Sequence, residues 1–458
     1  MVKLVPSALF RLLLMVVSFS FTTGCSSVSS KGARKPGRNI FITPLNYAAW
    51  GNDQLRLAVK DNIDVAGVVT TAGSKYFGDR HQPAASDAAC LELARQRGVL
   101  IVGKTNLSEF AVSPSGVNEY FGTPRNPLSF WRNRIPGGSS SGSAVAVAKD
   151  FADVAFGTDT AGSIRVPAAC CGVVGLKTTH GLISLQGVHP IEAEHMDTVG
   201  PLGKNIANAV IGMDLLQRGF LEQYIGAVAL QPSGRSIRVG RLRLKGTDPK
   251  IDAAIDLALL KAGFVPVALD AELSAQWEQA KADGNAVAAA GAWISDRKYQ
   301  GAAGVSLRTN VVILAGRLAY NTKYQAALAR RATWQAALGR AFEKVDVIAL
   351  PTLQRVPFYL PSKLDAGWLE AQTLAAMNTV PVNYAGNPAL AQPIPLRNSF
   401  FPVTSLQLIG PKFGEARLLN AGRIVEETSY PGHREETGAP AAIPLSALGR
   451  APATPDHR

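Results

Sequence analysis

The sequence predicts an α/β fold in which helices cover a β-sheet, because short apolar runs alternate with helical patterns along its 458 residues. Hydrophobic residues make up 47% of the chain, which is ample for a buried core and excludes a disordered protein. No segment after the N-terminal region reaches the length of about 18 apolar residues that spans a membrane, so a polytopic membrane protein is excluded. Residues 40–435 contain no linker, and a single large domain is expected.

Short apolar runs predict strands, and longer periodic segments predict helices. Val99–Val102 is apolar throughout, as in a buried parallel strand. Ser86 precedes an amphipathic pattern that ends at Gly98, as in a capped helix. The predicted strands are Leu55–Lys60, Val99–Val102, Asp153–Phe156, Val345–Leu350 and Thr404–Ile409, and the other predicted helices are Ser141–Lys149, Lys323–Glu343 and Glu415–Glu427.

The net charge of +13 does not indicate a nucleic-acid partner. Residues 1–38 contain six basic residues and no acidic ones, so the rest of the chain is only mildly basic. No basic run is interleaved with aromatic residues, which is the pattern expected of a nucleic-acid surface. A solvated basic surface, together with the basic N-terminal segment 1–38, explains the net charge, and no nucleic-acid partner is expected.

The N-terminus has the composition of an export signal. The basic residues Lys3 and Arg11 precede the largely apolar stretch Leu12–Phe21, which has the length of the hydrophobic region of a signal peptide. Cys25 and the residues before it resemble a bacterial lipobox, in which the cysteine receives lipid, although Thr22 stands where an aliphatic residue is usual. We therefore predict lipidation of Cys25. The alternative is an ordinary cleaved signal followed by a chance cysteine.

Four segments are predicted along the chain: a signal peptide (1–24), a polar tether (25–40), the main domain (41–438) and a loose tail rich in Ala and Pro (439–458). Ser26, rather than aspartate, follows the cysteine, which favours the outer membrane. The expected localisation is the periplasmic side, as an outer-membrane lipoprotein held by N-terminal acyl chains.

The cysteines and histidines predict neither a disulfide framework nor a metal site. Apart from Cys25 there are three cysteines, and two of them, Cys170 and Cys171, are sequence neighbours that we do not expect to pair. None of the six histidines has the spacing of a zinc site. No metal and no organic cofactor are expected.

Two short motifs match known patterns but lack the structural context that those patterns need. Residues 98–105 match a phosphate-binding loop, but the Val-Leu-Ile-Val in their middle predicts a buried strand instead of bare backbone N–H groups. Residues 138–142 match the nucleophile elbow G-x-S-x-G, which needs a hydrophobic strand before it, and the segment 131–136 is not one. We interpret neither motif as a site of that kind.

A longer series of motifs is difficult to explain by chance. It contains Pro136-Gly-Gly-Ser139-Ser-Ser-Gly and Gly157-Thr-Asp159-Thr-Ala-Gly162-Ser163-Ile-Arg165, with Ala58-Val-Lys60 upstream. With such motifs in order over roughly residues 45–430, the chain resembles the amidase signature family of serine hydrolases. The resemblance implies that family's fold, a single large domain with a mixed, twisted β-sheet covered by helices on both faces.

The resemblance also implies a Ser–cisSer–Lys triad in place of Ser–His–Asp. Matched by position, Lys60 is the base, Ser139 the bridging serine with a cis peptide, and Ser163 the nucleophile. A lysine can act as a base only when it is neutral, so we predict a pKa of Lys60 well below the usual value of about 10.4. The tight turn Thr160-Ala161-Gly162-Ser163 is expected to direct backbone N–H groups at one point, as an oxyanion hole.

Two positions depart from the family pattern, because Ala161 and Ser141 stand where glycine is common. Alanine keeps its N–H, so the oxyanion hole survives if the φ angle suits alanine, and the helix after Ser141 should tolerate serine. Neither departure removes a catalytic group. The segments His189–His195 and Gln300–Asn321 are expected to line part of the substrate pocket.

The sequence therefore predicts an exported, membrane-tethered amidase that hydrolyses the C–N bond of a small-molecule amide. Ser163 would form an acyl-enzyme and release ammonia or an amine. One alternative is a glutaminase subunit of an amidotransferase, such as the one serving tRNA-dependent glutamine synthesis. The export signal opposes it, because tRNA is cytoplasmic. The other alternative, a non-catalytic binding protein on the same scaffold, is opposed by the intact triad.

Overall fold

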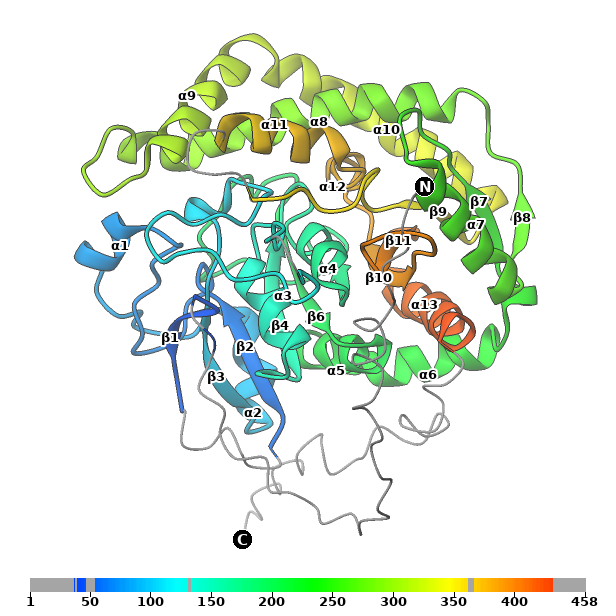
Figure 1. The fold of residues 1–458 in the computed structure, drawn as a ribbon, viewed down its shortest axis with the longest axis horizontal. Coiled ribbons are helices and arrows are strands. Elements are labelled where there is room, and N and C mark those ends of the chain that lie inside the picture. Colours follow the sequence, from blue (N-terminus) through cyan, green and yellow to red (C-terminus); the bar gives the residue numbers. More distant parts are fainter. Residues whose placement is uncertain (1–36, 38, 47–53, 131–132, 361–365, 431–458) are drawn as a thin grey trace, which may run out of the picture.

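Eleven strands form one sheet in the computed structural model of the chain, which describes residues 37, 39–46, 54–130, 133–360 and 366–430 (Figure 1). The strands are β1 (Phe41–Pro44), β2 (Arg56–Lys60), β3 (Leu100–Thr105), β4 (Val154–Asp159), β5 (Val174–Lys177), β6 (Thr198–Gly203), β7 (Arg238–Arg241), β8 (Val265–Val267), β9 (Val347–Pro351), β10 (Ala389–Pro395) and β11 (Val403–Ile409). Their order across the sheet is β1-β3-β2-β4-β6-β5-β10-β11-β9-β7-β8.

Parallel pairs lie toward the two ends of this sheet and antiparallel pairs lie in its middle, except that the edge strand β1 is antiparallel to β3. β2 is parallel to β3 and β4, and β7 is parallel to β8 and β9. From β4 through β6, β5, β10 and β11 to β9, every neighbouring pair is antiparallel. The prediction of a single α/β domain built on a mixed sheet is therefore confirmed.

Helices lie on both faces of the sheet (Figure 1). They are α1 (Lys75–Arg80), α2 (Glu92–Gln96), α3 (Ser141–Ala148), α4 (Arg165–Cys171), α5 (Ile206–Leu216), α6 (Phe220–Leu230), α7 (Pro249–Ala262), α8 (Leu273–Asp296), α9 (Leu307–Thr322), α10 (Tyr324–Lys344), α11 (Ala366–Ala376), α12 (Val380–Ala385) and α13 (Glu415–Ser429). One apolar cluster joins the sheet to α3, α4, α8, α10 and α12, and a second joins it to α2, α5, α7 and α13.

The alternation of side chains along β2 determines the face of the sheet on which Lys60 lies. Leu57 and Val59 belong to the second cluster, whereas Ala58 belongs to the first. Lys60 lies two residues after Ala58 and therefore shares its face. The side chain of Lys60 therefore lies on the face of the sheet that α3 and α4 cover.

The five predicted strands are confirmed with small shifts at their ends, and β3 runs through the phosphate-loop pattern, where a strand was predicted. The helix predicted after Ser86 begins later, with a 3₁₀ turn at Ala89–Leu91 that is followed by α2. The residues at the two starts are Ala88 and Leu91, and neither provides a capping side chain, so Ser86 does not cap the helix.

Neither α8, which has 24 residues, nor the neighbouring α9 was predicted from the sequence. Much of the face of α8 that packs inward consists of alanine and glycine, which give a weak periodic signal. These small residues let helices approach closely: a Cβ added at Gly316 of α9 would lie 2.3 Å from the carbonyl oxygen of Ala289. No helix in the described ranges is long and apolar enough to cross a membrane.

Several predictions concern residues outside the described ranges. The signal peptide, Cys25 and nearly all of the tether fall there, as does the tail 439–458. The boundaries of these segments and the lipidation of Cys25 therefore stay predictions. Cys90, Cys170 and Cys171 are buried and free, so the described part of the chain contains no disulfide.

Candidate active site

Lys60, the last residue of β2, is fully buried and points toward a serine on the α3 side of the sheet. Its Nζ lies 2.7 Å from Ser139 Oγ and 2.7 Å from Thr158 Oγ1, a residue of the parallel neighbour β4. Burial lowers the pKa of Lys60 to about 7, although the negative charges of Asp159 and Asp197 oppose the shift. A large fraction of Lys60 is therefore neutral at physiological pH, as predicted.

The adjacent carboxylate does not hold Lys60 in its charged form. Asp61 Oδ1 lies 2.7 Å from Nζ of Lys104, the lysine of the phosphate-loop pattern, and both side chains are fully buried. Thr71 donates its backbone N–H and its hydroxyl to the other oxygen of Asp61. In the part of the chain that the structure describes, Lys60 forms no ion pair, so a structural role as the partner of a carboxylate is not supported.

Ser139 lies at the entrance to α3, where the peptide bond between Gly138 and Ser139 is cis, as the family resemblance implied. Its carbonyl oxygen accepts hydrogen bonds from the backbone N–H groups of Ser108 and Ser141. A Cβ at Gly138 would lie 2.6 Å from the carbonyl oxygen of Ser113, so glycine is needed there. Ser141 begins α3, which shows that the helix tolerates serine at this position.

The turn that carries Ser163 is anchored by two charged residues at its ends. Asp159 is the last residue of β4 and accepts a hydrogen bond from the backbone N–H of Ile164. Arg165 is the first residue of α4. The carbonyl oxygen of Ser163 accepts a hydrogen bond of 3.1 Å from the N–H of Ser140, so the two serine loops lie side by side. The Ser163 side chain is partly exposed, and its hydroxyl forms no hydrogen bond with any described residue.

The backbone of this turn leaves its N–H groups available. Those of Ala161, Gly162 and Ser163 have no hydrogen-bond partner within the described residues. Gly162 has a φ of 136°, and a Cβ there would lie 2.3 Å from Thr379 Oγ1, so only glycine fits. Ala161 does not have a positive φ. This explains why alanine can replace glycine at position 161 but not at the next position.

Arg165 is fully buried and joins the nucleophile turn to the sheet and to α12. Its guanidinium donates to both oxygens of Asp159, to Thr379 O at 3.0 Å and to Gln407 Oε1 at 2.7 Å. Burial opposes the charge of Asp159, but Arg165 and Asn383 outweigh it and lower the pKa of Asp159 to about 2. The turn is therefore held by a buried ion pair in which the lowered pKa keeps Asp159 negatively charged near neutral pH.

We expect Arg165→Met to destabilise the protein by about 3–5 kcal/mol, because it leaves the carboxylate of Asp159 buried without its counter-charge. Urea denaturation of the variant and of the wild type measures the change in the free energy of unfolding. The matched control is Arg95→Met, which breaks a partly exposed ion pair with Asp87 and should cost no more than about 1 kcal/mol. Equal costs for the two variants would contradict the structural role of Arg165.

The segment His189–His195, which was predicted to line part of the substrate pocket, is linked to the surroundings of the site by hydrogen bonds of His189 and of the nearby Asp197. Asn62 donates its amide N–H to Thr158 Oγ1 at 3.1 Å and to the carbonyl oxygen of His189 at 3.3 Å. At the other end of the segment, Asp197 accepts a hydrogen bond of 2.6 Å from the Thr160 hydroxyl. Residues 189–197 are therefore tied both to the surroundings of Lys60 and to the nucleophile turn.

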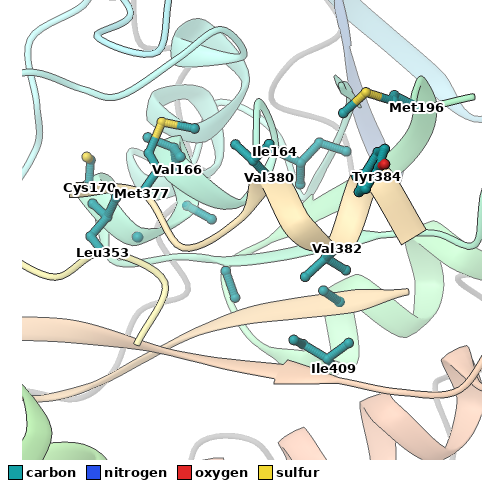
Figure 2. Close-up of a cluster of buried hydrophobic side chains, with 14 of the residues drawn as sticks. Ile164, Val166, Cys170, Met196, Leu353, Met377, Val380, Val382, Tyr384 and Ile409 are labelled. Carbon is teal, nitrogen blue, oxygen red and sulfur yellow. The ribbon is translucent and has the colours of Figure 1, made fainter. Parts of the chain in front are cut away.

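Buried apolar side chains pack around the residues that follow Ser163 (Figure 2). Figure 2 shows Met377 and Val380 beside Ile164 and Val166, the residues that follow Ser163. All four side chains are almost fully buried.

The described residues contain no group of three or more His, Cys, Asp or Glu that could hold a metal ion.

Comparison with known proteins decides the family. Residues 55–419 match the Amidase family. The chain belongs to the amidase family. It is an enzyme of the amidohydrolase type, which cleaves amide C–N bonds, and the prediction that it is an amidase is confirmed.

The similarity extends over nearly the whole length of two curated relatives. The chain is 35% identical over 429 residues to a glutamyl-tRNA(Gln) amidotransferase subunit of Halobacterium salinarum, covering 85% of this chain and 99% of the relative. It is 34% identical to the corresponding protein from Natronomonas pharaonis, covering 84% and 98%.

Solved structures agree in fold. The corresponding protein of the same amidotransferase from Thermotoga maritima superposes with a TM-score of 0.67 at 25% identity, covering 83% of this chain and 84% of that one. The 6-aminohexanoate cyclic dimer hydrolase superposes with a TM-score of 0.72 over 86% and 90%, and at 22% identity this likeness concerns the fold alone. These neighbours support the assignment of the mixed sheet and its helices to the amidase fold.

The comparisons contradict the predicted localisation. The relatives are named as subunits of an amidotransferase for glutamyl-tRNA(Gln). A reaction on tRNA takes place in the cytoplasm, where tRNA is found. The prediction of an outer-membrane lipoprotein on the periplasmic side is therefore wrong. It depended on the composition of residues 1–25, which carries no information about the domain that the relatives share. Without the export argument, the glutaminase alternative fits the relatives better than the free-standing amidase.

Proposed function

We propose that Lys60, Ser139 and Ser163 form the catalytic triad of this amidase. Neutral Lys60 takes the hydroxyl proton of Ser139, and Ser139 takes the proton of Ser163 as Ser163 attacks the amide carbon. The 2.7 Å contact between Lys60 Nζ and Ser139 Oγ supports the first transfer, and the lowered pKa of Lys60 supports its role as base. The second transfer requires the Ser163 hydroxyl to turn toward Ser139, a contact that this conformation does not make.

The bond changes follow from this proton path. A bond forms between Ser163 Oγ and the carbonyl carbon, and the carbonyl oxygen becomes an oxyanion that the N–H groups of the turn 160–163 stabilise. The C–N bond then breaks as the proton returns through Ser139 to the leaving nitrogen, so that ammonia departs. Water attacks the acyl-enzyme along the same path, which releases the carboxylic acid and restores Ser163. No step needs a cofactor.

We propose glutamine as the amide donor, with the chain serving an amidotransferase as its glutaminase. The observation that carries this proposal is the match to amidotransferase subunits over 98–99% of their length. Such a protein hydrolyses the side-chain amide of glutamine and supplies the ammonia to a second reaction. The intact Lys60–Ser139 contact argues against a non-catalytic binding protein on the same scaffold.

We expect glutamine to be hydrolysed with a kcat/KM at least about tenfold higher than that of acetamide, benzamide or a fatty acid amide, because binding of the rest of the substrate contributes to the rate. Ammonia release by the purified chain measures it, with Ser163→Ala prepared in parallel to detect a contaminating glutaminase. A clear preference for the aryl or fatty acid amide would contradict the glutamine proposal and leave the amidase activity in place.

A further inference from the structure

Three surface loops contain no acidic residue and several arginines. They are residues 125–134, which precede the loop with Ser139, residues 352–360, which follow β9, and residues 396–402, which join β10 to β11. The structure describes all of these residues except 131 and 132. Among the described residues, the arginines are Arg125, Arg134, Arg355 and Arg397.

Arg134 connects the three loops. The backbones of the first and second loops pair in antiparallel fashion at Arg134 and Tyr359, and the guanidinium donates to the Tyr359 hydroxyl at 2.8 Å. The guanidinium carbon lies 4.0 Å from the centroid of the Tyr359 ring and 5.5 Å from that of Phe401. Phe401 belongs to the third loop and is almost fully buried, so it anchors this loop against Arg134.

Each of the three loops exposes one aromatic ring to solvent. Phe400 is fully exposed, Phe130 is 74% exposed and Tyr359 is 47% exposed. The large aliphatic side chains of these loops, in the described ranges, are instead buried or half-buried. We call the three exposed rings and three of the arginines the basic-aromatic patch: Phe130, Tyr359, Phe400, Arg125, Arg134 and Arg397.

The positive charges at this patch lack acidic partners. Arg125 donates to two carbonyl oxygens of its own loop, at 3.2 and 3.4 Å. Lys250 of α7 adds another charge, because its Nζ lies 2.8 Å from the carbonyl oxygen of Asn398 in the third loop. Neither these two residues nor Arg134 and Arg397 form an ion pair with a carboxylate of the described residues. Such a concentration of positive charge attracts a polyanion.

The combination of arginines and exposed rings matches the two chemical groups of a nucleic-acid strand. Phosphates bind guanidinium groups through paired hydrogen bonds, and bases stack on aromatic faces. In a duplex the bases stack on one another and do not offer their faces, so exposed rings favour a single strand. An anionic membrane would favour exposed aliphatic side chains as well, and those of these loops are buried or half-buried.

We propose that the basic-aromatic patch binds single-stranded nucleic acid, with its arginines on phosphates and its rings stacked on bases. The inference goes beyond the proposed function and does not rest on it, because the patch contains no residue of the proposed triad. It replaces the expectation of no nucleic-acid partner. That expectation considered continuous runs of sequence, whereas the fold joins basic and aromatic residues from three separate loops.

The test measures binding of a labelled oligouridine of about 12 nucleotides to the full chain by fluorescence anisotropy. We expect saturable binding to the wild type that weakens as salt is added. Phe400→Ala should weaken binding by at least about fivefold, because a stacked base loses its ring, and should leave the salt dependence unchanged. Arg397→Gln should reduce the slope of log affinity against log salt by about 0.7, the effect of one phosphate contact of a single strand.

Phe413→Ala and Arg340→Gln are the matched controls. Phe413 is an exposed phenylalanine beyond the opposite end of β11 from Phe400, and Arg340 is an exposed arginine of α10. Both variants should bind oligouridine as the wild type does. The basic residues of 1–38 are the same in every variant, so a difference in binding comes from the substituted side chain. All four substitutions are at exposed positions, and thermal unfolding verifies that each variant is folded.

Equal binding of oligouridine by the wild type, Phe400→Ala and Arg397→Gln would overturn the proposal, as would tighter binding of a blunt RNA duplex of the same length. Vesicles of phosphatidylcholine and phosphatidylserine test the membrane alternative. If they bind the wild type but not Phe400→Ala, and oligouridine does not bind, the patch recognises lipid and the proposal is wrong. Ammonia release by Phe400→Ala should equal that of the wild type, so failure of the patch and failure of the proposed function are distinguishable.

Discussion

Ser163→Ala is expected to reduce kcat by on the order of 10⁴-fold or more, because it removes the atom that forms the acyl-enzyme. The expected loss of stability is small, less than about 1 kcal/mol, since the Ser163 side chain is partly exposed and its hydroxyl has no partner among the described residues. Ammonia release measures the activity, and thermal unfolding verifies that the variant is folded.

Ser141→Ala is the matched control for this prediction. Ser141 is the first residue of α3, two positions after Ser139, is fully buried, and its hydroxyl also has no hydrogen-bond partner among the described residues. We expect activity close to that of the wild type. Substantial turnover by Ser163→Ala would contradict its assignment as nucleophile, and an equal loss in Ser141→Ala would show that the loop is merely sensitive to substitution.

Lys60→Met is expected to lower kcat/KM by about 10²–10⁴-fold and to remove one limb of its pH profile. The neutral form of Lys60 is the active one, and burial lowers its pKa to about 7. In the wild type, kcat/KM should therefore rise with pH through an ionisation near 7 and then level off. A Lys60→Met variant that keeps this limb and the wild-type rate would contradict the triad.

Lys177 is the control for this pH limb, because burial, together with the charge of Arg165, also lowers its pKa to about 7. Its Nζ donates to the backbone carbonyls of Thr178 and Asn387, at 2.8 Å each, and contacts no serine among the described residues. We expect Lys177→Met to retain the limb near pH 7 in kcat/KM, although it should be less stable. Loss of the limb in Lys177→Met instead of Lys60→Met would reassign the ionisation.

Stability alone cannot distinguish the two lysines. Each loses its proton near pH 7 in the folded state but only near 10.5 in the unfolded chain. Between these values the unfolded state binds more protons, so these two groups make the free energy of unfolding rise with pH. Either substitution should reduce this slope, whereas only Lys60→Met should change the kinetic profile.

The strands of the core could be predicted from short-range patterns, and the residues proposed as the triad could be predicted from motifs that resemble those of the amidase signature family. Apolar runs such as Val99–Val102 predict strands because burial on both faces of a sheet requires apolar residues at every position. The motifs around Lys60, Ser139 and Ser163 could be recognised because their glycines meet strict local demands, as the close approach at Gly138 and the φ of Gly162 show. By contrast, the compositional signal in residues 1–25 led to the wrong localisation.

The sequence by itself determined the alternation of strands and helices, the amidase chemistry and the identity of the three residues proposed as the triad. Only the tertiary structure decided that Asp61 pairs with Lys104 and leaves Lys60 without an acidic partner among the described residues. It also brought Asp296 of α8 to within 3.2 Å of His189, across more than 100 positions of the chain. The physical reason is that sequence spacing governs hydrogen bonds within a turn or strand. The pairing of buried charges instead depends on which distant elements the packing of the core places side by side.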